Sequence, residues 1–318
     1  MQPPRLIPGD KVAIISPSQP PTTKHSYEDF DNARKNFERA TGLLTVLSAN
    51  ALAEHYYSAG TVTQRLDDFH WAISNPEIKG VVFSVGGNTA IELVDKLDYG
   101  LIKKNPKIIT GISDATVLLN AILSKTGLIT YHGVEFTDFA NETMTYEIDS
   151  MLRAWFEDGV GVIKPNPNWR DLDNLPTAYS GWETIRPGVV EGVIIGGNFS
   201  SFSQLFPTRY LPKLHGSILV VECYRYSKRD IHNALARLRF WGVFDDIGGL
   251  IIGYCLGSDE PNIKGNDRNI KDLVLEVTSG YDFPVIQIGE IGHNVENLIL
   301  PIGAQAKLNA SAKEFTII

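Results

Sequence analysis

The sequence predicts an α/β protein whose N-terminal part is built around a parallel sheet. Up to about residue 130, short apolar runs such as KVAIIS (11–16) and GVVFSV (80–85) alternate with segments of helical spacing. This alternation is typical of βαβ units, in which neighbouring strands run parallel. Beyond about residue 190, apolar strand-like runs dominate. The later part of the chain is therefore expected to be richer in β structure.

The N-terminal elements are placed by their periodicity and their ends. The run 11–16 is apolar and precedes a proline, as expected of a buried strand. Residues 27–41 place apolar side chains on one helical face, and Gly42 gives a stop signal. Thr63 is expected to cap the next helix, which Pro76 closes. The other expected elements are strands at 43–48, 80–85, 107–110 and 128–132, a helix beginning near Asn88, and a helix at 114–125.

The pattern is lost from about residue 137 to residue 190. We therefore predict an N-terminal α/β domain over 1–136, a linker or lid over 137–188, and a β-rich C-terminal domain over 189–318. The prolines and tryptophans that mark the middle region are Pro165, Pro167, Pro176, Pro187, Trp155, Trp169 and Trp182. The remaining expected elements are helices near 143–156, 228–240 and 269–278, with strands at 189–195, 217–222, 248–255 and 284–289.

Composition and charge exclude several classes of function. The net charge is −8 and the predicted pI is about 5.4, whereas a nucleic-acid binder needs a basic surface. The longest apolar runs are shorter than the ~20 residues that a membrane span requires. The N-terminus lacks the pattern of a signal peptide, so a cytoplasmic location is expected. Cys223 and Cys255 both lie in apolar runs, which favours buried thiols over a disulfide.

The most informative local pattern is KIITGISDATVLL (107–119), in which an apolar strand passes directly into a helix at Ser113. A serine on such a turn projects from the sheet edge, and the helix N-terminus directs backbone N–H groups at the same spot. The crowded backbone requires small neighbours, which Gly111 and Ala115 provide. These features indicate a nucleophile elbow. The alternative is that Ser113 or Asp114 merely caps the helix, because both residue types are favoured there.

A serine nucleophile needs a base, usually a histidine that an acid orients. His132 ends the strand that follows the elbow helix, and His293 lies in a glycine-flanked loop. Position alone does not choose between these two histidines. The acid is equally open, because Glu222 ends an apolar strand while Glu135 and Glu290 stand in similar places. Each of these side chains can also be an ordinary structural residue.

Two glycine pairs follow predicted strands, at Gly86-Gly87 and at Gly196-Gly197. The N–H group of Gly86, together with that of Asp114, is a candidate oxyanion hole for a tetrahedral intermediate. The alternative for both pairs is a turn next to a helix cap. Neither pair completes a dinucleotide or phosphate-loop motif, and metal-ligand spacings of His and Cys do not occur. Neither a cofactor nor a metal is therefore expected.

Taken together, these segments resemble the LD-carboxypeptidase family of serine peptidases. The resemblance covers nearly the full chain, and it depends on the order and spacing of several blocks rather than on any one of them. The blocks are LIPGDKVAIISPS (6–18), QRLDDFHWAISNPEIKGVVFSVGGN (64–88), LDYGLIKKNPKIITGISDATVLLNAI (97–122), GVIIGGNFSSFSQL (192–205), SILVVE (217–222), ARLRFWGVFDDIGGLIIG (236–253) and IGHNVENLILPIGAQAKL (291–308).

The resemblance implies a Ser-Glu-His triad. The family's serine lies in a G-x-S-D motif, matched by Ser113. Its glutamate ends the strand after the second Gly-Gly-Asn block, matched by Glu222. Its histidine lies in the block GHNVENLILPIG, matched by His293, which the resemblance favours over His132.

The resemblance also implies the oxyanion hole of Gly86 and Asp114 N–H groups. The implied fold is an N-terminal Rossmann-like parallel-sheet domain with a smaller β-rich C-terminal domain, the triad forming across the two. Homodimers are expected because they are common in the family.

Two substrate classes follow from the resemblance. One branch of the family removes the terminal D-alanine from murein tetrapeptides, and another, of microcin C immunity type, cleaves aminoacyl-nucleotide amides. Trp169 and Trp182 in the linker favour the second branch if they stack on a nucleobase. The alternative is that both tryptophans only pack the linker onto the protein. A non-catalytic α/β protein that binds a small ligand is the third interpretation.

Overall fold

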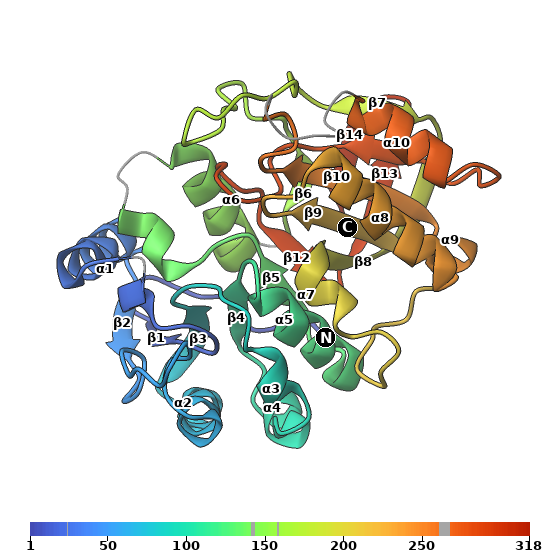
Figure 1. Cartoon of the computed structure of the whole chain (residues 1–318). Coiled ribbons are helices and arrows are strands. Elements are labelled where there is room, and N and C mark those ends of the chain that lie inside the picture. The colour runs from blue at the N-terminus through green and yellow to red at the C-terminus, as the bar shows by residue number, and fades with distance from the viewer. Residues whose placement is uncertain (24, 141–143, 158, 261–267) are drawn as a thin grey trace. The chain divides into compact units, whose positions relative to one another are not determined.

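The computed structural model describes residues 1–23, 25–140, 144–157, 159–260 and 268–318. The chain forms two compact units, each built on its own sheet (Figure 1). The first comprises Met1–Asp158, Ser201–Pro212 and Ile299–Gly303, and the second Gly159–Ser200, Lys213–Leu298 and Ala304–Ile318. These units and the domain ranges predicted from the sequence are different divisions of the chain. The ranges 1–136, 137–188 and 189–318 stay a prediction.

The sheet of the first unit has six strands in the order β12-β5-β4-β3-β1-β2. Strands β1 to β5 all pair in parallel. At one edge of the sheet, β12 pairs antiparallel with β5. The strands are β1 (Lys11–Ile15), β2 (Leu44–Leu47), β3 (Ile78–Phe83), β4 (Ile108–Gly111), β5 (Thr130–His132) and β12 (Leu300–Ile302). The parallel sheet expected from the βαβ pattern is confirmed.

The helices of this unit form two groups (Figure 1). Helix α2 contacts α3 and α4, which in turn contact α5, whereas α1 contacts η2. These helices are η1 (Pro21–Thr23), α1 (Tyr27–Thr41), α2 (Val62–Ser74), α3 (Ile91–Val94), α4 (Tyr99–Lys104), α5 (Ala115–Thr126), η2 (Phe136–Ala140) and α6 (Thr145–Phe156). The helix expected from Asn88 is short, and α4 follows it as a separate segment.

Capping side chains determine where two of these helices begin. Ser26 and Asp29 form a capping box at the start of α1. Thr61, not Thr63, caps α2, because its hydroxyl accepts the N–H of Gln64 and the Gln64 side chain accepts the N–H of Thr61. Such a reciprocal pair satisfies two backbone donors at once, which favours the earlier start.

The second unit contains an eight-stranded mixed sheet in the order β6-β14-β13-β8-β9-β10-β11-β7. Strands β8 to β11 pair in parallel at its centre, and the outer strands pair antiparallel. Its strands are β6 (Gly161–Ile163), β7 (Glu183–Arg186), β8 (Val189–Asn198), β9 (Ile218–Cys223), β10 (Gly249–Cys255), β11 (Val285–Gln287), β13 (Gln305–Asn309) and β14 (Glu314–Ile317). Its helices are α8 (Lys228–Phe240), α9 (Val243–Asp246) and α10 (Ile270–Val277), and α7 (Phe199–Ser203) spans the boundary between the units.

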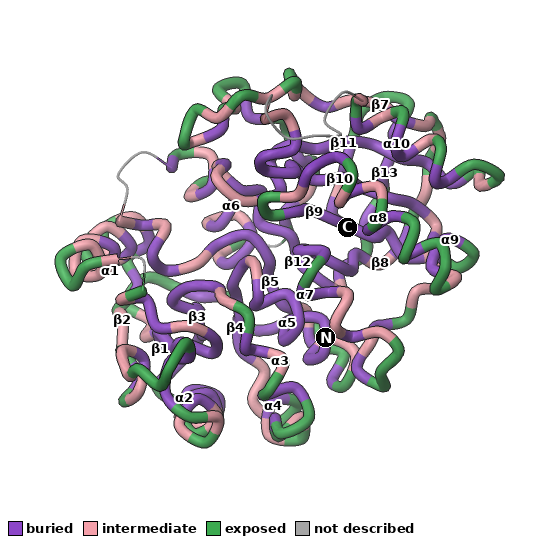
Figure 2. The backbone as a smooth tube through the Cα atoms, in the orientation of Figure 1, coloured by how far each residue is buried: buried purple, intermediate pink, exposed green. Residues whose placement is uncertain are grey.

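The predicted fold class is confirmed, as an α/β unit with a parallel sheet and a second unit rich in strands. Helices 27–41 and 228–240 have the predicted bounds, while most other predicted elements differ from the observed ones by one to a few residues. Both cysteines are free and buried, as predicted. The central strands are buried along most of their length (Figure 2), whereas α2 and α4 carry exposed residues among buried ones. Among the described residues, no helix is both long enough and apolar enough to span a membrane.

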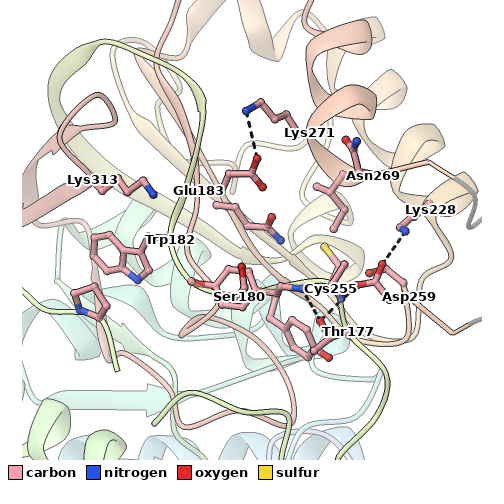
Figure 3. Close-up of a pocket in the computed structure, with 18 residues that line it drawn as sticks. Thr177, Ser180, Trp182, Glu183, Lys228, Cys255, Asp259, Asn269, Lys271 and Lys313 are labelled. Carbon is pink, nitrogen blue, oxygen red and sulfur yellow. Dashed lines mark hydrogen bonds and ion pairs between the residues drawn. The ribbon is translucent and has the colours of Figure 1, made fainter. Parts of the chain in front are cut away.

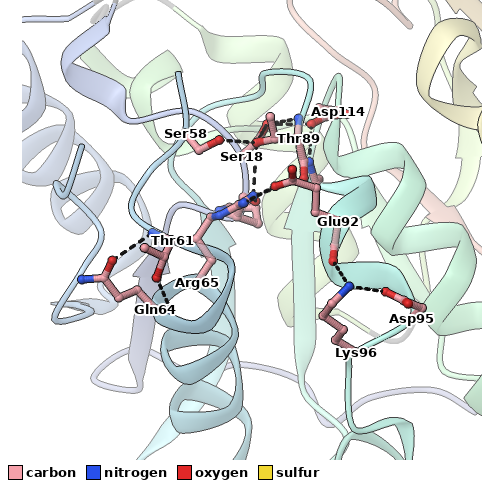
Figure 4. Close-up of polar contacts among 12 residues, drawn as sticks. Ser18, Ser58, Thr61, Gln64, Arg65, Thr89, Glu92, Asp95, Lys96 and Asp114 are labelled. Atoms are coloured by element: carbon pink, nitrogen blue, oxygen red, sulfur yellow. Dashed lines mark hydrogen bonds and ion pairs between the residues drawn. The ribbon is translucent and has the colours of Figure 1, made fainter. Parts of the chain in front are cut away.

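A buried arginine ties three segments of the first unit together (Figure 4). The Arg65 side chain on α2 is 2% exposed. Its guanidinium donates to the carbonyl of Pro17 at 2.9 Å and to the carbonyl of Thr89 at 3.1 Å, and it forms an ion pair with Glu92. These contacts place the loops after β1 and β3 beside the first turns of α2.

We predict that Arg65→Met lowers the free energy of unfolding by about 2–4 kcal/mol, because two buried carbonyls lose their donors. Arg34→Met is the matched control, since the Arg34 side chain is 43% exposed and its ion pairs, with Asp31 and Glu38, join residues of the same helix. That variant should change stability by less than about 1 kcal/mol. Denaturant unfolding monitored by circular dichroism measures both. Equal losses in the two variants would contradict this account.

Candidate active site

The β4–α5 connection in the first unit has the geometry of a strained turn. Strand β4 ends at Gly111, and α5 begins at Ala115. Between them, Ser113 has a φ of 62°, in the left-handed region that non-glycine residues rarely occupy. Strain of this kind is kept only where the surrounding structure enforces it, often at functional sites. The turn therefore agrees with the predicted nucleophile elbow.

Close packing explains why the elbow contains small residues. A Cβ atom added to Gly111 would lie 2.7 Å from the Cβ of Ala115 and 2.7 Å from the ring of Phe83. Real Cβ atoms do not approach other heavy atoms this closely. A larger residue at position 111 would therefore push the first turn of α5 away from β3.

The side chain of Asp114 holds the turn from inside the first unit. Its carboxylate is fully buried and accepts hydrogen bonds from the Ser18 hydroxyl at 2.6 Å and the Ala90 N–H at 2.8 Å. The Ser201 hydroxyl adds a longer bond of 3.4 Å. Figure 4 shows Ser18, Thr89 and Asp114 converging at this point. Asp114 occupies the N-cap position of α5 without a side-chain capping bond, so the simple helix-cap interpretation does not describe it.

Gly86, after β3, lies directly against the candidate nucleophile. A Cβ added to Gly86 would be 2.7 Å from the Ser113 Cβ and 3.0 Å from its Oγ. Only glycine allows this close approach. The Gly86 N–H donates to Oε2 of Glu135 at 2.7 Å. The N–H that the sequence suggests as an oxyanion donor therefore has a carboxylate as its partner in this structure.

The second unit brings Glu222 and His293 together. Glu222 lies near the end of β9 and is fully buried, and its Oε2 is 2.9 Å from Nδ1 of His293. A carboxylate accepts, so this contact assigns the proton to Nδ1 and leaves Nε2 as an acceptor. The imidazole is 15% exposed and packs against the Tyr224 ring at 4.7 Å between centroids. The pair has the form of a base oriented by an acid.

Two small features position this pair, and the first of them has no separate signal in the sequence. A Cβ added to Gly253 on β10 would lie 2.7 Å from the Cβ of Glu222, so only glycine fits beside that carboxylate. The N–H of Gly292, next to His293, donates to the buried side chain of Asn297 at 3.0 Å. Asn297 belongs to the same sequence block as His293, whose spacing reflects this contact.

The other histidine considered from the sequence, His132, is fully buried in β5 of the first unit. Ser113 belongs to the first unit as well, whereas Glu222 and His293 belong to the second. The structure thus pairs His293, and not His132, with the predicted acid.

Trp169 and Trp182 both hydrogen-bond within the second unit. Trp182 is 5% exposed, and its indole N–H donates to Oε2 of Glu290 at 2.7 Å. The Trp169 indole donates to the carbonyl of Gly289 at 2.8 Å, and its ring packs edge-on against Tyr254. These contacts are those of side chains that pack the 159–188 segment onto the unit.

A pocket of about 490 Å³ lies in the second unit (Figure 3). Two ion pairs stand in its wall, between Lys228 and Asp259 at 2.7 Å and between Lys271 and Glu183 at 3.3 Å. Trp182 also lines it, and Trp169 lines a second pocket of about 460 Å³. Both volumes are in the range of small-molecule sites. The triad residues are not among the described residues that line either pocket.

Glu290 is the buried acid that anchors this segment. Burial raises its pKa, although the N–H of Asn166 and the indole of Trp182 act in the opposite direction. The Glu290 carboxylate therefore binds a proton more tightly in the folded protein than in the unfolded chain. As the pH falls, it is protonated at a higher pH in the folded state. The destabilising contribution of the buried charge is therefore relieved between neutral pH and about pH 4.5.

We predict that Glu290→Gln lowers the free energy of unfolding by about 1–3 kcal/mol at pH 7, because an amide NH₂ then faces a hydrogen-bond donor. The difference in the free energy of unfolding between wild type and variant should widen toward pH 5, since only the wild type is stabilised by protonation of residue 290. Denaturant unfolding at the two pH values measures both quantities. A gap that narrows as the pH falls would contradict the raised pKa.

Comparisons with known proteins extend over most of the chain. The LD-carboxypeptidase N-terminal domain profile matches residues 12–133, and the LD-carboxypeptidase C-terminal domain profile matches residues 191–308. The chain is 28% identical to the microcin C7 self-immunity protein MccF of Escherichia coli, over 97% of this chain and 93% of that protein. It is 29% identical to the murein tetrapeptide carboxypeptidase of Pseudomonas aeruginosa, over 95% and 94%.

Solved structures give a consistent result. MccF in complex with glutamyl sulfamoyl guanosine matches with a TM-score of 0.89 and 26% identity, over 99% of this chain and 97% of that chain. An MccF-like protein from Bacillus anthracis matches with a TM-score of 0.88 and 28% identity, over 100% and 99%.

Proposed function

Because the chain belongs to the LD-carboxypeptidase family of peptidases, hydrolases that act on peptide bonds, we propose that it cleaves an amide through Ser113, His293 and Glu222. The observation that carries this proposal is the 2.9 Å contact between His293 and the buried Glu222. The left-handed backbone of Ser113 supports it from the other unit. In this proposal the nucleophile belongs to the first unit, whereas the base and the acid belong to the second.

In the proposed reaction, Nε2 of His293 takes the proton of Ser113 as its Oγ attacks the carbonyl carbon. The Nδ1–H of His293 donates to Glu222 throughout, which stabilises the imidazolium. The tetrahedral intermediate collapses when the C–N bond breaks and the imidazolium gives its proton to the leaving nitrogen. Water, activated by the same imidazole, then attacks the acyl-enzyme and regenerates the serine.

The developing oxyanion requires donors beside Ser113. We assign this role to the N–H groups of Asp114 and Gly86, as the elbow geometry suggests. The close approach of Gly86 to Ser113 supports the assignment. Since Glu135 accepts the Gly86 N–H, that carboxylate has to leave before the oxyanion can use the donor.

Two substrate classes fit this chemistry. The similarity to a murein tetrapeptide carboxypeptidase supports a peptide that ends in D-alanine. The similarity to MccF, with solved complexes of aminoacyl sulfamoyl nucleosides, supports an aminoacyl-nucleotide amide. For the second class, Trp169 and Trp182 stay the proposed contacts to the base, since both line pockets. Their present hydrogen bonds equally support a role in packing the linker.

We predict that the purified protein releases a free amino acid from one of two substrates, a murein tetrapeptide or an aminoacyl-sulfamoyl adenosine. Ser113→Ala should lower kcat by about 10⁴-fold or more, because the nucleophile is lost. Ser74→Ala, an exposed serine on α2, is the matched control and should keep full activity. Mass spectrometry of the products measures all three proteins. Undiminished turnover in a folded Ser113→Ala protein would refute the mechanism.

A cytoplasmic location and a homodimer complete the proposal. Both come from the family resemblance and the sequence pattern, and both stay predictions.

A further inference from the structure

Glu135 presents a carboxylate to the candidate nucleophile within the first unit. The residue lies between β5 and η2, and its backbone N–H donates to the Asp138 carboxylate at 2.9 Å. The Thr137 hydroxyl donates to its Oε1 at 3.3 Å. The other oxygen, Oε2, accepts the N–H of Gly86 at 2.7 Å. The backbone is therefore anchored, while rotation about the side-chain bonds can still move the carboxylate.

The carboxylate and the nucleophile approach the same point. A Cβ built on Gly86 lies 3.0 Å from Oγ of Ser113 and 3.6 Å from Oε2 of Glu135. The proposed oxyanion would form beside the same residue. A negative carboxylate that stays there repels the negative charge that develops in the transition state. Catalysis therefore needs a positively charged group. This group would bind the Glu135 carboxylate, move it away from the Gly86 N–H and neutralise its charge.

We propose that Glu135 is a specificity-determining residue that binds the free α-ammonium group of the residue whose carbonyl Ser113 attacks. Covalent geometry places an α-nitrogen about 2.5 Å from its own carbonyl carbon. An ammonium at that distance reaches a carboxylate beside the oxyanion hole and forms a charge-assisted hydrogen bond. This inference rests on the proposed function and names its substrate class.

The inference separates the two candidate substrates by their chemistry. In a murein tetrapeptide, the α-nitrogen of the residue before the terminal D-alanine is part of a peptide bond, so it carries no charge. In an aminoacyl-nucleotide amide, the α-nitrogen of the aminoacyl group is a free ammonium at neutral pH. Glu135 thus selects aminoacyl amides with a free α-amino group.

The test compares an aminoacyl-sulfamoyl adenosine with its Nα-acetyl derivative. Wild type should prefer the free amine, and Glu135→Gln should reduce the ratio of the two kcat/KM values at least tenfold. Glu135→Asp, which keeps the charge, should restore part of that ratio. The matched control is Glu77→Gln, a surface glutamate that pairs with Lys11, and it should leave the ratio unchanged. An unchanged ratio in Glu135→Gln would overturn the inference.

Binding separates this inference from the proposed function. Calorimetry measures both compounds on Ser113→Ala and on Ser113→Ala/Glu135→Gln, where no hydrolysis is needed. If wild type hydrolyses neither compound but Glu135→Gln abolishes the preference in binding, the recognition role stands and the proposed activity on this class fails. If the Ser113→Ala protein binds the acetylated compound as tightly as the free amine, or binds neither, the recognition role is overturned.

Discussion

The left-handed backbone of Ser113 is the constraint on which the first unit depends. Such a conformation costs about 1–3 kcal/mol for a non-glycine residue, so neighbouring contacts must enforce it. The buried carboxylate of Asp114 accepts two short hydrogen bonds, one from the Ser18 hydroxyl and one from the Ala90 N–H. Those partners lie after β1 and at the start of α3, so one carboxylate joins three connections at the sheet edge. These contacts hold the strained backbone at the residue that is the proposed nucleophile.

The second unit depends on a different constraint, the burial of Glu222. A fully buried carboxylate is costly unless it is hydrogen-bonded. The His293 ring provides a partner at 2.9 Å, and Gly253 leaves room for the side chain beside β10. The same contact that offsets the burial of the charge also orients the imidazole. The contact between His293 and Glu222 therefore serves both the stability of the unit and the proposed chemistry.

Much of the fold could be predicted from the sequence because its signals are local. The apolar face of helix 228–240 and the strand runs of the first unit follow from periodicity, and the elbow follows from residues adjacent in the chain. The position of β12 in the first sheet could not be predicted, because three residues carry no pairing information. The edge strands β6 and β7 were missed, since they are short and lie in the proline-rich region.

The candidate site, too, could be predicted only where its signals are local in the sequence. The serine turn was readable from the chain, whereas the choice of His293 over His132 depended on the family resemblance. The contact between Glu135 and Gly86 joins residues 49 positions apart, and the sequence placed Glu135 only among the candidate acids. The closeness of Gly253 to Glu222 is likewise a property of neighbouring strands. Contacts of this kind require the sheet order, which one sequence does not specify.

The proposed chemistry depends on Ser113 as a nucleophile that His293 activates. The most direct measurement is the rate of phosphonylation by a fluorophosphonate, with the modified residue located by peptide mass spectrometry. We predict modification at Ser113, slowed about 100-fold or more in His293→Ala, as loss of a general base implies. Modification of a different residue, or an equal rate in His293→Ala, would contradict it.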